Sequence, residues 1–210
     1  MPIRNTEQAW GSVNKAFHWI LALLIIGMGF LGWYMTWLPN APGKIKIYAL
    51  HKSIGLTILA LVLLRILWRQ FDRRPPELPM PQWQHVAARA VHIALYGVML
   101  LMPLSGWLFN SAGNFPLQWF GLFHVPSLTD GENPTLKAIA GITHLILFWV
   151  LLVAFILHAG GALKHHFIDR DSTLRRMLPW GIRAEKSPAS PTTTTINSAQ
   201  NSPSTPEVKS

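Results

Sequence analysis

Two histidines on one apolar segment constrain this chain more than any other feature. His144 and His158 lie fourteen residues apart within a stretch that runs from Leu136 to Leu163. On an α-helix, fourteen residues return a side chain to within about 40° of the same face and advance it by about 21 Å. Such a helix would carry two imidazoles on one side, near opposite faces of a lipid bilayer.

The composition is that of a membrane protein. Half of the 210 residues are hydrophobic and only 13% are charged, against about 25% charged residues in an ordinary soluble domain. Four apolar segments are long enough to cross a hydrocarbon core of about 30 Å. They cover about residues 16–37, 47–68, 86–109 and 138–163. The segments predict an all-α fold, an integral membrane four-helix bundle formed by residues 1–186.

The distribution of positive charge predicts the orientation of this bundle. Most of the 18 lysines and arginines precede the first span, frame the connection between the second and third spans, or follow the fourth span. The exceptions are Lys44, Lys46, Lys52 and Lys137. Because loops rich in lysine and arginine stay in the cytoplasm, we expect both termini on the cytoplasmic side. The net charge of +9 then reflects topology and anionic lipid, and it indicates no nucleic-acid partner.

This orientation determines which histidines can meet. The first helix starts in the cytoplasm, so His18 near its start has the same depth as His158 near the end of the fourth helix. The second and fourth helices both start outside, so His51 and His144 share the outer depth. We therefore expect two pairs of imidazoles, His18 with His158 and His51 with His144.

Paired imidazoles between apolar helices fit the axial ligation of haem iron. Polar groups inside a membrane are costly and usually functional. The chain contains no cysteine, which excludes thiolate ligands and a covalent c-type attachment. We interpret the four paired histidines as the metal ligands of two b-type haems. The alternative is a histidine-based metal or proton conductor without haem, and such a protein would be colourless.

Glycines flank the predicted ligands in the sequence. Small residues let a planar macrocycle, or equally a neighbouring helix, come close to a helix backbone. The glycines expected to have one of these two roles are Gly55, Gly141, Gly160 and Gly161.

The sequence resembles the bacterial cytochrome b561 family over about residues 10–180. The most specific parts are LKHHFIDRDSTLRRMLPW at residues 163–180, the histidine spacing of the fourth helix, and FHW at residues 17–19. The resemblance implies a multi-pass protein of the bacterial inner membrane that binds haem through the same four histidines. It also implies electron exchange with the ubiquinone pool. The best-known activity of similar proteins is oxidation of periplasmic superoxide, with the electron passed to ubiquinone.

Four further residues are candidate contacts of the cofactor or the substrates. Arg65 and Arg89 lie at cytoplasmic helix ends, and His92 lies at the depth of the inner pair. We expect these three to contact haem propionates, or in the case of His92 a quinone carbonyl. Lys52, next to His51, would attract a small anion to the outer face.

Two functions remain open at this point. One is single-electron transfer from a periplasmic donor, superoxide or a protein, to the quinone pool by an oxidoreductase that acts alone. The other is a haem b membrane anchor that passes electrons between a partner dehydrogenase or hydrogenase and quinone. The first function predicts haem reduction by superoxide without a partner. The second predicts co-purification with a large peripheral subunit.

Two segments outside the spans carry simpler expectations. The apolar connection at about residues 110–136 contains no lysine or arginine, and we expect a short helix at the outer membrane interface. Residues 187–210 are rich in serine, threonine and proline. Such a composition cannot bury enough apolar surface to fold, so we expect a disordered cytoplasmic tail.

Overall fold

A computed structural model describes residues 2–180, so the expected boundary at residue 186 and the expected tail lie outside the described residues. The elements follow in the order α1 (Ser12–Trp37), α2 (Pro42–Phe71), α3 (Gln82–Ala112), β1 (Gln118–Trp119), β2 (Phe123–His124), α4 (Pro134–Phe167) and α5 (Thr173–Met177). Each predicted span lies within one of the four long helices. The expected helical membrane bundle is therefore confirmed.

Local signals set where the helices start. Both α2 and α4 begin with a proline. Its fixed φ angle suits the first helical turn, and its missing N–H costs nothing there because the N–H groups of that turn have no partner within the helix. At α4 the side chain of Asn133 also accepts a hydrogen bond of 2.9 Å from the backbone N–H of Leu136. This contact caps one of the unpaired N–H groups and fixes the start of α4.

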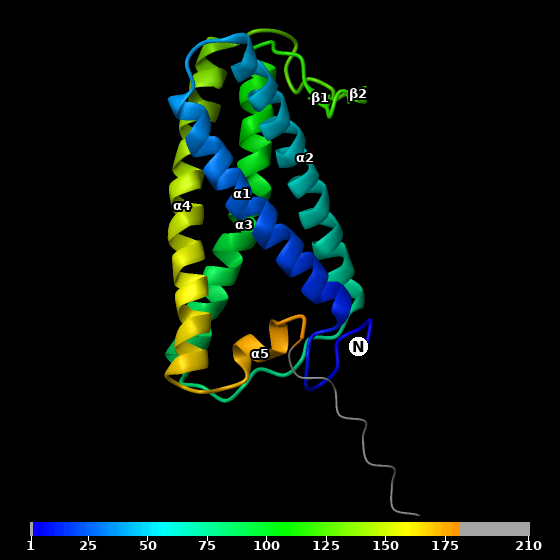
Figure 1. Cartoon of the computed structure of the whole chain (residues 1–210), viewed down its shortest axis with the longest axis vertical. Helices are drawn as coiled ribbons and strands as arrows, with labels where there is room; N and C mark the ends of the chain where they lie inside the picture. Colours follow the sequence, from blue (N-terminus) through cyan, green and yellow to red (C-terminus); the bar gives the residue numbers. More distant parts are fainter. Residues whose placement is uncertain (1, 181–210) are drawn as a thin grey trace, which may run out of the picture.

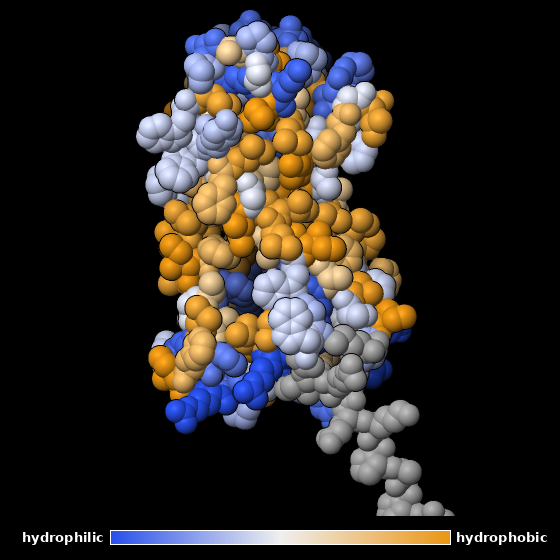
Figure 2. Space-filling view, viewed as in Figure 1, coloured by the Kyte–Doolittle hydropathy of each residue, from blue (hydrophilic) through white to orange (hydrophobic). Residues whose placement is uncertain are grey.

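The outer surface of the bundle is apolar along the middle of its length. Figure 2 shows a hydrophobic band there, with hydrophilic residues gathered toward the two ends. All four long helices are long and apolar enough to cross a membrane, and most side chains of their apolar windows are not buried inside the protein. In water this exposure would be costly, whereas lipid tails cover it without cost. The chain is a multi-pass membrane protein.

The four helices do not all pack equally closely. Close backbone packing joins α1 to α2, α2 to α3, and α3 to α4. A compact apolar cluster of Leu21, Ile58, Val62 and Met99 fills the space among α1, α2 and α3. Among the described helices, α4 makes no comparable backbone contact with α1 or α2. Wider separations therefore lie between α4 and these two helices.

The two ends of the bundle differ in their covering (Figure 1). At one end, here called the α5 end, the short helix α5 lies across the bundle beside the N-terminal segment. At the opposite end, here called the hairpin end, strands β1 and β2 project to one side. The N-terminal segment and the residues that follow α4 thus share one end.

The prediction of a short helix in the connection at residues 110–136 is wrong. The segment forms an antiparallel two-stranded hairpin instead, in which Trp119 pairs with Phe123. Phe120 and Gly121 adopt positive φ angles of 48° and 74°, which close a tight hairpin turn. The hydroxyl of Ser53 on α2 accepts a hydrogen bond of 3.0 Å from the backbone N–H of Phe120. A bond to a neighbouring helix thus holds this backbone where a local helix was expected.

Candidate functional site

One face of α4 carries both predicted ligands, His144 and His158, in a series of residues spaced by seven. Seven residues return a side chain to within about 20° of the same face and advance it by about 10.5 Å. Along α4 this series is Lys137, His144, Leu151, His158 and His165. The same spacing recurs on the other three helices and creates layers across the bundle.

The first layer lies toward the α5 end and is polar. It contains His18 of α1, Arg65 of α2, His92 of α3 and His158 of α4, and is called the α5 layer below. The rings of His18 and His158 have centroids 6.0 Å apart and planes inclined by 62°. The ring of His92 lies closer to His158, with centroids 5.2 Å apart. Three imidazoles from three helices thus meet at one level.

The second layer lies two heptads away, toward the hairpin end. It contains Gly32 of α1, His51 of α2, Gly106 of α3 and His144 of α4, and is called the hairpin layer below. The rings of His51 and His144 have centroids 6.4 Å apart and planes inclined by 66°. This level therefore carries two imidazoles and two glycines.

An apolar layer separates the two polar levels. Its members at the intermediate heptad positions are Ile25, Ile58, Met99 and Leu151. Ile58 and Met99 belong to the buried core, and Ile25 packs against it. The two imidazole levels are therefore distinct sites with hydrocarbon between them.

The ring of His144 is held in one orientation by α3. Its Nδ1 lies 3.0 Å from the carbonyl oxygen of Met102 and 3.0 Å from the hydroxyl oxygen of Ser105. Because a carbonyl oxygen can only accept, Nδ1 carries the hydrogen and Nε2 keeps its lone pair. Metal-ligating histidines are typically fixed in this way by a backbone carbonyl. His144 is thus prepared to bind a metal through Nε2.

Two glycines stand directly against the imidazoles of the hairpin layer. A Cβ atom at Gly106 would lie 3.2 Å from Cε1 of His144, and one at Gly32 would lie 3.4 Å from Cε1 of His51. A side chain at Gly106 would crowd the His144 ring, whereas a Cβ at Gly32 would just touch the His51 ring. Sequence reasoning missed these two glycines. The available signal was the fourteen-residue spacing from His18 to Gly32 and from His92 to Gly106.

Two of the glycines expected beside the ligands, Gly141 and Gly55, face other residues than the histidine rings. A Cβ at Gly141 would meet the ring of Phe109 at 3.2 Å, and one at Gly55 would meet Met28. Around Gly160 and Gly161 no atom lies within 4 Å of a built Cβ. Gly141 and Gly55 therefore allow contact between helices, which was one of the two roles expected for them.

These residues fit a metal macrocycle at each level. A metal–imidazole bond is about 2 Å long, so one metal between two rings places the ring centres about 6 Å apart. Both predicted pairs have this separation. Each pair also bridges α4 to a helix with which α4 lacks close backbone contact among the described elements. In the hairpin layer the buried Nδ1 of His51 has no hydrogen-bond partner among the described residues, as expected where a further group binds.

Arg65 brings a cation to the α5 layer, whereas Arg89 lies on the exposed surface of α3. The guanidinium of Arg65 lies 5.5 Å from the ring centroid of Tyr96, one turn along α3 from His92. Arg65 is close enough to act electrostatically on His18, His92 and His158. Arg89 is exposed to solvent. Arg65 is therefore the better placed of the two predicted propionate contacts.

Lys52 has a structural role at the hairpin end. Its Nζ donates to Oδ1 of Asn110 at 3.0 Å and to the carbonyl oxygen of Pro116 at 3.3 Å. Asn110 is only 4% exposed, and its amide donates in turn to the carbonyl oxygen of Phe115. The lysine predicted to attract anions thus also fastens the loop that covers the hairpin end.

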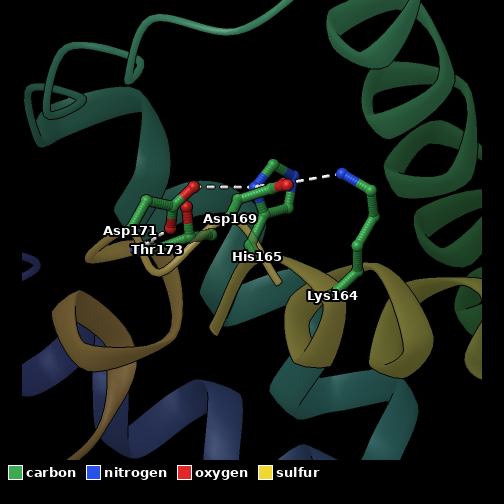
Figure 3. A network of polar contacts seen from close by, with 5 residues as sticks. All are labelled: Lys164, His165, Asp169, Asp171 and Thr173. Atoms are coloured by element: carbon green, nitrogen blue, oxygen red, sulfur yellow. Dashed lines mark hydrogen bonds and ion pairs between the residues drawn. The ribbon is translucent and has the colours of Figure 1, made fainter. Parts of the chain in front are cut away.

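A network of polar contacts closes the end of α4 (Figure 3). Nδ1 of His165 lies 2.7 Å from Oδ2 of Asp171, and Nζ of Lys164 lies 2.6 Å from Oδ2 of Asp169. Burial raises the pKa of Asp171, but hydrogen bonds from Thr173 and from His165 outweigh this effect and hold the pKa below its usual 3.8. These contacts tie both carboxylates to the last turn of α4 and fix the turn from α4 into α5.

The helix α5 ties distant segments together at its end of the bundle. The guanidinium of Arg176, which is 8% exposed, donates to the carbonyl oxygens of Glu7, Gln8 and Pro76. The indole of Trp19 donates to the carbonyl oxygen of Met177 at 3.0 Å. Because Trp19 is adjacent to His18, this clasp helps to position the α1 member of the α5 layer.

Two levels of neighbouring imidazoles inside an apolar four-helix bundle are the arrangement expected of a membrane cytochrome. The family profile described as prokaryotic cytochrome b561 matches residues 9–180. The chain belongs to this family, whose name implies b-type haem and electron transport. The sequence-based family prediction is therefore confirmed.

Curated relatives agree with this assignment. Cytochrome b561 homolog 2 of Escherichia coli (strain K12) is 39% identical over 182 residues, which cover 85% of this chain and 95% of the relative. Cytochrome b561 homolog 1 of the same organism is 30% identical and covers 77% and 92%. A protein of Yersinia pestis named "Probable superoxide oxidase CybB" is 31% identical and covers 82% and 97%. The similarity thus extends over nearly the whole of each relative.

Proposed function

We propose that this protein binds two haems b and transfers single electrons from superoxide outside the cytoplasm to the quinone pool. His51 and His144 would hold one haem, and His18 and His158 the other. The observation that carries the proposal is the presence of two imidazole pairs, 6.0 and 6.4 Å between ring centroids, at two levels across the wide separations around α4.

The proposed orientation places the α5 end in the cytoplasm of a bacterium and the hairpin end outside its inner membrane. The charge pattern supports it, because cations are concentrated near the ends of the chain and in the connection between α2 and α3. The common position of α5 and the N-terminal segment also supports it. Both termini would then be cytoplasmic.

The chain's own residues would orient and insulate the cofactor. Bound haem supplies a one-electron carrier at each level. Because two histidines would hold each haem, the donor would pass on its electron without binding to the metal. The carbonyl oxygen of Met102 would hold the His144 ring, and Gly106 would leave space beside it. The apolar layer around Ile58 would exclude water between the two levels.

Superoxide as the electron donor is supported by the name of the Yersinia pestis relative and by positive charge at the hairpin end. Lys137 lies one heptad outward of His144, with its Nζ 4.8 Å from the ring centroid of Phe115. Lys52 contacts the same loop from α2. Cations around an opening concentrate anions and accelerate their arrival. We propose that these two lysines attract superoxide to the hairpin layer.

A quinone is proposed as the electron acceptor. Each superoxide loses one electron and leaves as dioxygen. A quinone takes up two electrons and two protons to become a quinol, so two superoxide ions would be consumed for each quinone. His92 is a candidate contact for a quinone carbonyl or a haem propionate, because its ring adjoins His158 in the α5 layer.

A spectroscopic experiment tests this function. The purified haem-loaded protein would be mixed with a superoxide-generating system without any other protein, and the reduced haem band would be followed. We expect reduction that superoxide dismutase prevents, and reoxidation on adding a short-chain ubiquinone. If superoxide leaves the haems oxidised while chemical reductants reduce them, superoxide is not the donor. Reduction only by a co-purifying peripheral subunit would favour the membrane-anchor alternative.

A further inference from the structure

We infer that Arg65 makes the haem of the α5 layer the easier of the two to reduce, so that electrons run downhill from the hairpin end to the α5 end. The inference rests on the proposed function, because it requires two bound haems. It goes further by assigning a direction to electron flow and a residue that sets it.

The two layers differ at equivalent positions on two helices. In the α5 layer the α3 position is His92, whereas in the hairpin layer, two heptads along, it is Gly106. On α2 the position two heptads from His51 is Arg65. The same helix therefore supplies an imidazole to the hairpin layer and a cation to the α5 layer. The α5 layer is thus more polar and more positive.

Arg65 brings a positive charge to this layer, and no carboxylate side chain among the described residues pairs with it. Its guanidinium lies 5.5 Å from the ring centroid of Tyr96, which is one turn along α3 from His92, and the guanidinium of Arg69 lies 5.3 Å from the same ring. None of the ion pairs within residues 2–180 involves Arg65. A half-buried guanidinium in this position keeps its full charge, because arginine does not lose its proton in proteins.

A cation near a haem favours its reduced state. Reduction adds one negative charge, and attraction to a nearby positive charge is strong where water is scarce. Each haem brings the same propionates, so the difference between the two levels must come from the chain. Arg65 should therefore raise the potential of the haem held by His18 and His158.

The lysines of the hairpin end do not cancel this difference. Nζ of Lys52 is bonded to Asn110 and Pro116 in the loop, and Nζ of Lys137 lies over the rings of Phe109 and Phe115. Lys137 is one heptad, about 10 Å, outward of His144. The charge of Lys52 is directed at the loop through these two bonds, away from the ring of its neighbour His51 along the chain. Arg65, by contrast, stands at the level of the imidazoles themselves.

The test is a redox titration of the haem-loaded protein, followed by optical absorbance. In the wild type we expect two components. The variant His51→Ala should lose the lower-potential component and keep the higher one, which identifies the higher component as the haem of the α5 layer. If His51→Ala instead keeps the lower-potential component, the inferred direction is wrong. This measurement needs no change at Arg65.

The variant Arg65→Gln then tests the residue itself. We expect the electron equilibrium between the two haems to shift at least tenfold toward the hairpin layer, which corresponds to 59 mV for one electron. The lower-potential component should not move. Arg65→Lys should keep most of the wild-type potential difference, and Arg175→Gln, at an exposed arginine of α5, should leave both potentials unchanged. Unchanged potentials in Arg65→Gln, or an equal fall of both, would overturn the role of Arg65.

Failure of this inference can be told apart from failure of the proposed function. A wild-type protein with fewer than two titrating haems would contradict the proposed function. A protein with two haems whose potentials ignore Arg65 would contradict only the inference.

Discussion

The backbone of Gly106 lies against the imidazole of His144, so that a Cβ atom at this glycine would lie 3.2 Å from Cε1 and 3.4 Å from Nδ1 of the ring. The same ring is hydrogen-bonded to the Met102 carbonyl from the preceding turn of α3. One helix thus both orients the predicted ligand and leaves space beside it.

The first prediction concerns this space. Gly106→Val should remove the haem held by His51 and His144 and leave the other haem in place, because the branched side chain would occupy the space beside the His144 ring. The measurement is the haem content per chain, with a fall from two to one. The matched control is Gly97→Val on the same helix, where a Cβ meets no atom within 4 Å. Equal haem loss in both variants would show a general packing defect instead.

The second prediction concerns the three imidazoles of the α5 layer. His158 has two imidazole neighbours, and His92 is nearer to it than His18 is. We nevertheless pair His158 with His18, because both lie at the same depth near the α5 end. We expect His18→Ala and His158→Ala to lose the same haem, and His92→Ala to retain two haems with an altered potential. If His92→Ala loses a haem and His18→Ala keeps both, His92 is the axial ligand.

The third prediction concerns the clasp formed by α5. Arg176→Ala should lower the free energy of unfolding by about 2–4 kcal/mol, because three carbonyl oxygens lose a charged donor in a largely buried position. Thermal unfolding in detergent, followed by circular dichroism, measures this effect. The neighbouring Arg175 is exposed, and Arg175→Ala should change stability little. Equal effects of the two variants would argue against a specific clasp.

The fourth prediction concerns acid stability. The pKa of Asp171 is lowered in the folded protein, because hydrogen bonds from Thr173 and His165 outweigh the opposite effect of burial. A lowered folded-state pKa contributes stability above the ordinary value of 3.8, and this contribution is lost as the pH falls through the folded-state pKa. The wild type should therefore lose melting temperature more steeply than Asp171→Asn below about pH 4. Parallel curves for the two proteins would contradict this assignment.

The sequence predicted the four spans because their length and apolar composition leave few alternatives in a membrane. It also predicted which histidines share a depth, since charge bias and position along each helix are one-dimensional properties. The rings of His18 and His158, and those of His51 and His144, are indeed neighbours. Their role as ligands stays a prediction.

Features that depend on rotation about a helix axis were harder to predict. Gly55 and Gly141, near the histidines in the sequence, face Met28 and Phe109, whereas the distant Gly32 and Gly106 face the rings. The hairpin was missed because bonds to Ser53 on another helix stabilise its turn. Such contacts between distant segments leave no local signal in the sequence.

The central claim is that four histidines hold two haems at two levels. Its most direct test is the haem content of the purified protein, measured as b-type haem per chain. We predict two haems in the wild type, one in His144→Ala, and none in the double variant His144→Ala with His158→Ala. A colourless wild-type protein from haem-replete cells, or a His144→Ala variant that keeps both haems, would contradict the account.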